Sequence, residues 1–399
     1  YLNNNSVLTT NWFKITPSPK FYFFLRRDIV DEKKYYSFPS VTDIFTLQSS
    51  GIKTHRDSFV YDFDKNCLLQ RIRQFGDLTF PNDVICNSYD INYSDPENLT
   101  KKRRAISTIG DFDLFIKNCT YRPFDDRFIF YHQHIIDRPR NEVMIHMLNE
   151  NLGLTIGRQG QVVGKEKSWN LAFVSDKIID VNLYRRGGAV LLPLNIYQDN
   201  FQRDLFNQTG SSKVSNILDL FSSKIINTYR QSVTPELIMS YIYGVFYSNT
   251  YRLLYSDFLA NDFPRIPITA KHDIFQILAS FGQRLIAIHL LKSLELDQTT
   301  VKYQGQGDYN TIERPKYNAN ENRVYINPTL YFEGVDPEVW EYQIGGYQVM
   351  DKYLKDRKGR KMDDPRHYIR IATALAKTIE IQAEIDEIYP EVEKDVIEF

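Results

Sequence analysis

Cysteine is scarce in this sequence, and long apolar runs are absent from it. The three cysteines, Cys67, Cys86 and Cys119, are odd in number and show no C-x-x-C spacing. This pattern argues against a disulfide framework or a zinc site and favours a reducing compartment, so we expect a cytoplasmic protein. No run of about 18 apolar residues occurs, and no membrane span is therefore expected. The N-terminus lacks both a secretory signal and an initiator Met, which predicts a fragment or a processed chain.

Composition excludes collagenous, low-complexity and disordered chains. Hydrophobic residues make up 42% of the 399 residues and charged residues 25%, values typical of a globular protein with a real core. The length predicts about two or three domains. Tryptophan is rare, with 3 residues against 27 Tyr and 26 Phe. Such a Tyr and Phe load suits β-structure, and it also fits surfaces that stack on bases or carbohydrates.

Charge is unevenly distributed along the chain. The net charge is −1, but residues 101–230 contain 19 Lys and Arg against 13 Asp and Glu, a local charge of +6. Residues 381–399 alone carry −6. An anionic partner would therefore meet the middle of the chain, although a charge of +6 is also common on ordinary domains.

Periodicity along the chain predicts an α+β fold with a β-rich middle and a helical C-terminal half. We expect three parts: an α/β segment over residues 1–100, a β-rich basic domain over 101–230, and a helical scaffold with short β pieces over 231–399. Expected strands include residues 20–25, 59–63, 127–131, 171–174, 189–192, 301–303 and 323–326. Expected helices cover residues 64–75, 142–148, 237–247, 251–259, 273–294 and about two dozen residues from Asp363, and residues 87–98 are expected to form a loop.

Two local patterns predict particular structural roles. Thr234-Pro235-Glu236 predicts a helix start, because a hydroxyl caps the helix, proline fits its first position and an acid suits its first turn. Trp340, Ile344 and Tyr347 recur at helical spacing, which predicts core packing.

Catalytic motifs are not recognisable. Gly160 and Gly164 are spaced too closely for a P-loop, and neither H-E-x-x-H nor G-x-S-x-G occurs. Adenine methyltransferases need an Asn/Asp-Pro-Pro-aromatic loop, and Asn327-Pro328 lacks the second proline and the aromatic. Asp125 and Asp126 are adjacent, so on a strand they would face opposite sides and could not share a proton.

Clusters of cations give the more informative signals. Lys101 to Arg104 form an unbroken basic run, and other arginines stand beside Pro or Gly in turns, where side chains can reach a phosphate or a base edge. We predict DNA contacts from Lys101, Lys102, Arg103, Arg104, Arg138, Arg140, Arg158, Arg185 and Arg186. The alternative for each is a solvated surface or an internal ion pair, such as Arg122 with Asp125 or Asp126.

Several segments, in order, resemble the C-terminal region of type ISP restriction–modification enzymes. They are Ser50 to Asp57, Tyr121 to Arg127, Asp137 to Arg140, Thr234 to Glu236, Asp262 to Pro267, Trp340 to Tyr347, and Leu354 to Arg360. The resemblance implies a specificity part within a polypeptide that also carries nuclease, helicase-like ATPase and adenine-N6 methyltransferase parts. It implies S-adenosylmethionine, ATP and Mg²⁺ for that parent enzyme and no cofactor in this chain.

These observations together predict a prokaryotic target-recognition domain that reads double-stranded DNA for attached methyltransferase and nuclease domains. Arg138 and Arg140 lie in the family-like Arg-Pro-Arg motif and are expected to contact phosphates, whereas Arg185 and Arg186 precede two glycines and are expected to contact bases. Two alternatives remain open at this point: a carbohydrate-binding or carbohydrate-active protein, and a protein-interaction scaffold built on the helical half.

Overall fold

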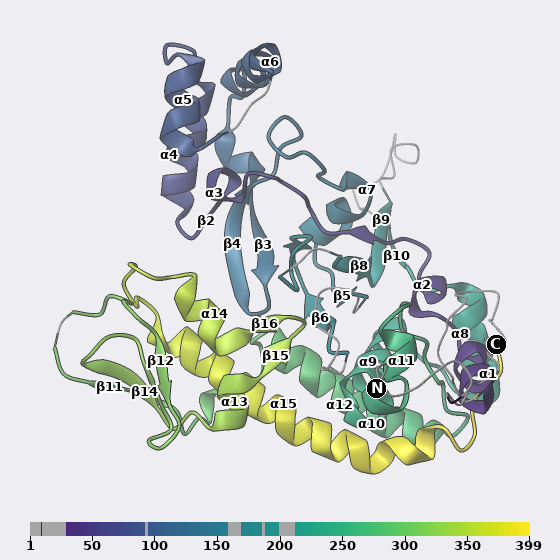
Figure 1. Ribbon diagram of the computed structural model, residues 1–399. Coiled ribbons are helices and arrows are strands. Elements are labelled where there is room, and N and C mark those ends of the chain that lie inside the picture. Colours follow the sequence, from purple (N-terminus) through teal and green to yellow (C-terminus); the bar gives the residue numbers. More distant parts are fainter. Residues whose placement is uncertain are drawn as a thin grey trace.

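Helices and short sheets alternate throughout the chain, which confirms the α+β class (Figure 1). The structure is a computed structural model that describes Thr9 and residues 29–91, 95–158, 169–185, 188–198, 212–307 and 309–399. The strand expected at residues 20–25 lies outside these ranges. Among the described residues, no helix combines the length and apolar character needed to cross a membrane.

Small helices surround the first sheet and form a projecting unit at one end of the molecule (Figure 1). Helix α4 buries Leu68, Leu69, Ile72 and Phe75, which recur at helical spacing, and its cap is Asp64, whose carboxylate accepts the Cys67 N–H at 2.8 Å. The helices of this N-terminal part are α1 (Ile29–Ser37), α2 (Val41–Ile44), α3 (Asp57–Val60), α4 (Lys65–Gly76), α5 (Asn82–Tyr89), α6 (Pro96–Ser107) and α7 (Asn141–Met144). Helices α4, α5 and α6 make up the projecting unit.

Two four-stranded sheets occupy the centre of the molecule. The first has the order β2-β4-β3-β7 and the second β1-β8-β5-β6, and all neighbours pair antiparallel except β3 with β7. Their strands are β1 (Ser49–Ser50), β2 (Tyr61–Asp62), β3 (Ile116–Arg122), β4 (Asp125–Phe130), β5 (Gly153–Ile156), β6 (Ala172–Ser175), β7 (Ile178–Ile179) and β8 (Val190–Pro193), and β9 (Asn195–Gln198) and β10 (Ser212–Ser215) form a separate hairpin.

Residues 49–53 connect the two sheets. After β1 the chain passes beside the end of β7, where Ile52 pairs with Asp180, and Lys53 then pairs with Arg138. The approach is close: a Cβ on Gly51 would lie 2.5 Å from the carbonyl carbon of Asp180, so only glycine fits. One extended segment thereby fixes the position of each sheet relative to the other.

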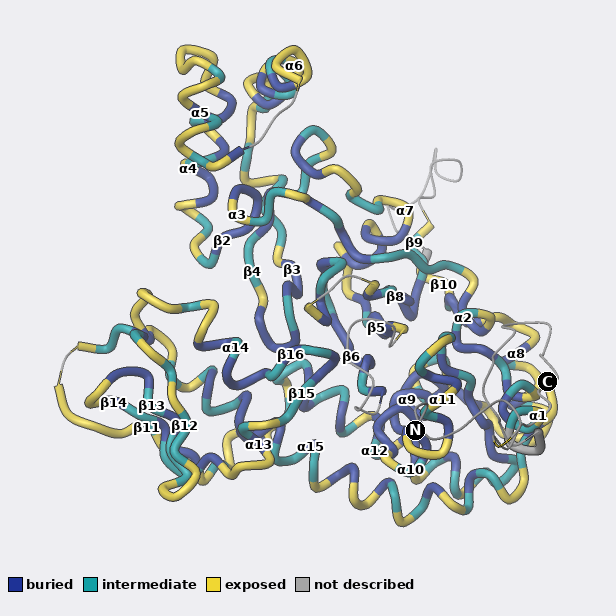
Figure 2. The backbone as a smooth tube through the Cα atoms, in the orientation of Figure 1, coloured by how far each residue is buried: buried dark blue, intermediate teal, exposed yellow. Residues whose placement is uncertain are grey.

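The C-terminal half contains a buried helical layer. Helices α9 and α12 cross so closely that a Cβ on Gly282 would lie 1.8 Å from the carbonyl oxygen of Ser240. Thr234 caps α9 by accepting the Leu237 N–H, which confirms the predicted start. Figure 2 shows α9 as almost entirely buried and α15 as alternately buried and exposed. The helices are α8 (Asp219–Tyr229), α9 (Pro235–Tyr247), α10 (Asn249–Leu254), α11 (Ser256–Leu259), α12 (His272–His289), α13 (Pro337–Glu341), α14 (Val349–Lys355) and α15 (Pro365–Val392).

A third four-stranded sheet lies at the far end of α15 from the chain terminus (Figure 1). Its order is β11-β14-β13-β12, with Val324 and Phe332 buried on the face that packs on the core. The strands are β11 (Lys302–Gly305), β12 (Lys316–Asn318), β13 (Arg323–Tyr325) and β14 (Leu330–Glu333), and β15 (Gln343–Ile344) and β16 (Tyr347–Gln348) form a short hairpin beside them.

Several sequence-based element predictions need correction. The expected loop over 87–98 contains the end of α5 and the start of α6, and the expected strand over 59–63 is divided between α3 and β2. The helix expected to reach residue 294 ends at His289. Ile344 and Tyr347 are buried as predicted, but they face each other across a β hairpin, because Gly345 turns the chain with φ +60°. The three-part domain division stays a prediction, since one hydrophobic core extends across the described residues.

A buried carboxylate joins the first sheet to the C-terminal half. Asp125 on β4 is 0% exposed and forms ion pairs with Arg127 at 2.8 Å and with Arg357, after α14, at 2.6 Å. Both guanidinium groups also lie over the ring of Phe63. Burial acts to raise the pKa of Asp125, but Arg357 and Arg127 outweigh this effect and hold the pKa below its ordinary value. Asp125 is therefore ionised and depends on both arginines.

We expect Asp125→Ala to lower the free energy of unfolding by about 3–5 kcal/mol, because it leaves two partly buried arginines without their carboxylate. The neighbouring Asp126→Ala is the matched control: its carboxylate is exposed and paired only with Lys177 at the surface, so a change below about 1 kcal/mol is expected. Urea unfolding at pH 7 measures both. Since the pKa of Asp125 is lowered on folding, the difference between the variant and wild type should shrink as the pH falls below the ordinary carboxyl pKa. Equal losses in the two variants would contradict this account.

Tyr347 tests whether the β15–β16 hairpin depends on packing or on polar contacts. Its side chain is 2% exposed, yet its hydroxyl is buried with no hydrogen-bond partner among the described residues. Tyr347→Ala should therefore lower the free energy of unfolding by roughly 3 kcal/mol, whereas Tyr347→Phe should be neutral or slightly stabilising. Thermal and urea unfolding distinguish the two, and a Phe variant as unstable as the Ala variant would contradict the packing interpretation.

Candidate nucleic-acid interface

One edge of the sheet β1-β8-β5-β6 collects loops that carry several of the predicted cations. The register aligns Ser50, Val190, Ile156 and Ala172 across the four strands at this edge. The chain therefore leaves β1 toward Lys53, enters β8 from Arg185 and leaves β5 toward Arg158, all from the same side. Separate loops on a rigid sheet are thereby brought to one surface.

The segment around Asp137 concentrates positive charge next to this edge. Backbone hydrogen bonds of 3.0 and 3.1 Å join Arg138 to Lys53. The Asp137 carboxylate accepts from Arg56 at 2.9 Å and from Nδ1 of His55 at 2.7 Å, and Lys102 lies 4.0 Å away. Burial acts to raise the pKa of Asp137, but His55, Arg56 and Lys102 together hold it below its ordinary value. One carboxylate thus organises several basic groups without neutralising them all.

Two predicted arginines, Arg158 and Arg185, extend this surface, and a third, Arg186, is not among the described residues. Arg185 is exposed and adopts φ +80°, a conformation that costs energy for any residue with a Cβ and often marks functional loops. Arg158 is exposed and its guanidinium lies 5.2 Å from the ring centre of Phe263. Arg186 falls outside the described ranges. We call the group Lys53, His55, Arg56, Lys102, Arg138, Arg158 and Arg185 the basic edge.

A pocket of about 460 Å³ opens in the middle of the basic edge. Its polar lining comes from Thr54, Asp57 and Asn182, with Lys53 and His55 beside them. Thr54 donates to one oxygen of Asp57, and the hydroxyl of Tyr121 donates to the other at 3.0 Å. The pocket therefore combines fixed acceptors with flanking cations.

The basic run from Lys101 to Arg104 lies on helix α6, not in a β-rich region, and its members have different environments. Lys101 and Arg104 are exposed, whereas Arg103 is 2% exposed. Arg103 donates to the Phe75 carbonyl at 2.8 Å, to Asn82 at 2.7 Å and to the Asp77 carbonyl. Its guanidinium thus joins α4, α5 and α6, which removes it from the predicted contact set.

Two further arginines behave differently from expectation. Arg140 is half-buried in a left-handed conformation, and its carbonyl accepts the Val143 and Met144 N–H groups at the start of α7. Arg122 does not pair with Asp125 or Asp126; it forms an ion pair with buried Asp180 at 3.0 Å. Burial raises the pKa of Asp180 to about 6 despite this pair. Arg122 thus has a place within the fold, whereas only the backbone of Arg140 makes these bonds and its predicted phosphate contact stays a prediction.

Most of the tyrosine and phenylalanine side chains in the described ranges form core, not a stacking surface. The largest fully buried side chains include Tyr35, Tyr184, Tyr241, Tyr243, Tyr247, Tyr251, Tyr255, Tyr368, Tyr389, Phe59 and Phe75. This burial removes the observation on which the carbohydrate alternative depended.

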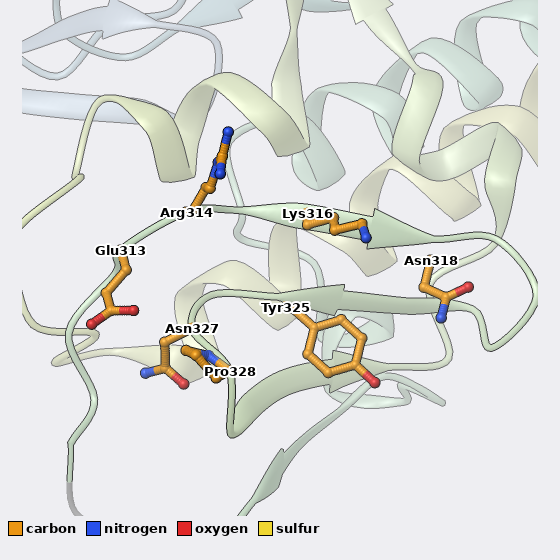
Figure 3. Close-up of a pocket in the computed structure, with 7 residues that line it drawn as sticks. All are labelled: Glu313, Arg314, Lys316, Asn318, Tyr325, Asn327 and Pro328. Carbon is orange, nitrogen blue, oxygen red and sulfur yellow. The ribbon is translucent and has the colours of Figure 1, made fainter.

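A second hollow lies on the β11–β14 sheet and is shown in Figure 3. Tyr325 and Asn318 extend from one side of the strands, while Arg314 points away from them. The polar atoms of Asn327 bind the neighbouring backbone, and Arg323 is paired with Glu333 at 2.7 Å. The lining of the hollow has two cations, Arg314 and Lys316, and one carboxylate, Glu313, so this surface carries fewer cations than the basic edge.

Groups that could hold a metal ion are not found among the described residues. Asp125 and Asp126 face opposite sides of β4, one buried and one exposed, as the strand spacing predicts.

Sequence reasoning missed Lys53, His55, Arg56 and Asn182. A signal existed for three of them, because three basic residues occur within four positions of the Ser50–Asp57 segment. Asn182 carried no such signal: only the pairing of residue 52 with residue 180 brings it beside Lys53.

The fold and the basic edge together define a class: an α+β protein that presents cationic loops from one sheet edge. Residues 43–384 match the family described as Type ISP C-terminal specificity domain, and the chain belongs to that family. A comparison with curated proteins finds no match.

Solved structures share the fold. The chain is similar to "ATP-dependent Type ISP restriction-modification enzyme LlaBIII bound to DNA", with 21% identity and a TM-score of 0.70 over 93% of this chain and 25% of that one. A nuclease-deletion mutant of the Type ISP enzyme LlaGI with a DNA substrate mimic gives 18% identity and a TM-score of 0.65 over 95% of this chain and 31% of that one. A DrdV–DNA complex gives 17% identity and a TM-score of 0.67 over 98% of this chain and 41% of that one. The chain thus spans less than half the length of each.

Arg103 and Arg104 form a matched pair that tests whether the buried arginine of α6 supports the fold while the exposed one does not. Arg103→Ala should lower the free energy of unfolding by roughly 2–3 kcal/mol, because it leaves buried carbonyl groups without donors. Arg104→Ala should change it by less than about 0.5 kcal/mol, since the side chain is exposed. Urea unfolding measures both, and a stable Arg103→Ala variant would return this residue to the candidate contacts.

Proposed function

We propose that this chain is the target-recognition part of a type ISP restriction–modification enzyme and binds double-stranded DNA through the basic edge. One observation carries the proposal: cations from segments 53–56, 102, 138, 158 and 185 gather on one side of the molecule. Family membership and the DNA bound in the similar structures support it. Phosphates attract such a surface independently of sequence, and polar groups among the cations supply specificity.

The roles within the basic edge follow from how firmly each residue is held. Arg138 is fixed by the backbone pairing with Lys53, which suits a phosphate contact that sets the register on the duplex. Arg185 is exposed beside the pocket, and its N–H donates to the carbonyl of Asn182 at 2.6 Å, which suits a base contact. Lys101 and Arg104 extend the phosphate-binding surface along α6.

Catalysis belongs, in this proposal, to other parts of a longer polypeptide. Methyltransferase and helicase–nuclease parts would bind S-adenosylmethionine, ATP and Mg²⁺, and this chain would bind none of them. It would direct adenine-N6 methylation and cleavage by choosing the DNA site. The whole enzyme would act on DNA in the prokaryotic cytoplasm.

DNA binding by the chain should be salt-sensitive, and individual arginines should contribute in different ways. If about four to six phosphates are contacted, log affinity should fall against log salt with a slope near −4 to −5. Arg138→Ala should weaken all duplexes alike and reduce the slope by about one, whereas Arg185→Ala should weaken the cognate duplex by about 1–3 kcal/mol and relax one position. Fluorescence anisotropy with single-base variants of the site measures these effects.

Arg366→Ala is the control for loss of one positive charge. Arg366 is exposed on α15, paired with Asp297 and not part of the basic edge, so its removal should leave affinity and slope unchanged. If Arg138→Ala and Arg185→Ala bind like Arg366→Ala, the DNA-facing surface lies elsewhere.

A further inference from the structure

We infer that the pocket in the basic edge reads one adenine of an A·T pair, whose major-groove edge carries an exocyclic amino group beside an acceptor nitrogen, through Asn182 and Asp57. The inference rests on the proposed function and names which side chains supply its specificity. Both residues line the pocket, together with Lys53, Thr54 and His55. The pocket opens between the loops that bear Arg138 and Arg185. If these arginines contact a duplex, the major groove of the DNA lies over the pocket.

Asp57 supplies a fixed acceptor inside this pocket. Thr54 Oγ1 and the Tyr121 hydroxyl each donate to one of its two oxygens, so the carboxylate is held in one orientation. A carboxylate has about four acceptor positions, and two remain after these bonds. An amino group can donate to them. The O6 of guanine and the O4 of thymine are acceptors and would be repelled by the negative charge.

Asn182 supplies a matching pair of groups. Its main chain is fixed, because the Asp180 carboxylate accepts its N–H at 2.8 Å and its carbonyl accepts the Arg185 N–H at 2.6 Å. Among the described residues, its side-chain amide has no hydrogen-bond partner. An amide presents one acceptor and one donor, the pattern complementary to N6 and N7 of adenine. A preorganised backbone with an uncommitted amide is suited to base reading.

The cations around the pocket have a different role from Asp57 and Asn182, which are proposed to read the base. His55 is oriented by the 2.7 Å contact of its Nδ1 with Asp137, and Lys53 by its backbone pairing with Arg138. Both residues lie on the segment that pairs with Arg138, the proposed phosphate contact. We therefore assign Lys53 to the DNA backbone, where it contributes affinity for every sequence alike.

The test compares base preference position by position. Wild type, Asn182→Ala, Asp57→Asn and Lys53→Ala, each as the 399-residue chain, select binders from a pool of random duplexes, and affinities for the selected site and all its single-base variants are then measured. Asn182→Ala should lose discrimination at one position that wild type reads as an A·T pair, by about 5- to 150-fold, and keep every other position. Asp57→Asn should relax the same position, and Lys53→Ala should weaken all duplexes alike.

Asn320→Ala, at an exposed turn of the β12–β13 hairpin, is the matched control and should select the wild-type site. Thermal unfolding checks each variant, and Asn182→Ala tests the inference even if Asp57→Asn fails to fold, because the Asn182 side chain has no described bond to lose. Unchanged selectivity in Asn182→Ala, or a relaxed position that wild type reads as a G·C pair, overturns the inference and leaves the proposed function standing. Wild-type binding without any sequence preference overturns the proposed function itself.

Discussion

The ion pairs of Asp125 are the constraint on which the rest of the arrangement depends. A fully buried carboxylate is tolerated only with well-placed partners, and here one partner follows two residues later on the same strand while the other comes from residue 357. Sheet β2-β4-β3-β7 is thereby tied to the end of α14. The ring of Phe63 lies beneath Arg127, Arg357 and also Arg360, so the cations are held on an apolar surface as well as by charge.

From β4 the constraint passes through the backbone to the basic edge. Strand β4 pairs with β3, and β3 with β7. Asp180, which follows β7, pairs with Ile52, and Lys53 then pairs with Arg138. A second buried ion pair, Arg122 with Asp180, reinforces the same boundary from the side of β3. The loops that we assign to DNA are consequently attached to the most tightly held part of the molecule, which limits how far their cations can move when a ligand binds.

Arginines in this protein divide into two groups by what surrounds the guanidinium. Arg103, Arg122, Arg127 and Arg357 are used within the fold, and each lies at a junction between elements distant in sequence. Arg138 and Arg185 lie in exposed turns with their backbones fixed, which leaves their side chains for a partner. Two of the segments that resemble the type ISP family contain arginines used within the fold: Tyr121 to Arg127 and Leu354 to Arg360. Those segments therefore preserve the scaffold as well as the contact surface.

The sequence by itself determined the α+β class, the helix beginning at Pro235, the last helix from Pro365 and the cationic character of the middle segment, because capping, periodicity and charge are local properties. The ordered family-like segments also indicated the specificity-domain family. Only the tertiary structure decided which cations are available. Arg103 and Arg104 are adjacent and chemically identical, yet one is buried among backbone carbonyls and the other is exposed, since helix α6 presents different faces to α4 and to solvent. Asn182 and Lys53 meet because strands pair across the chain, and such long-range pairing leaves no local pattern to read.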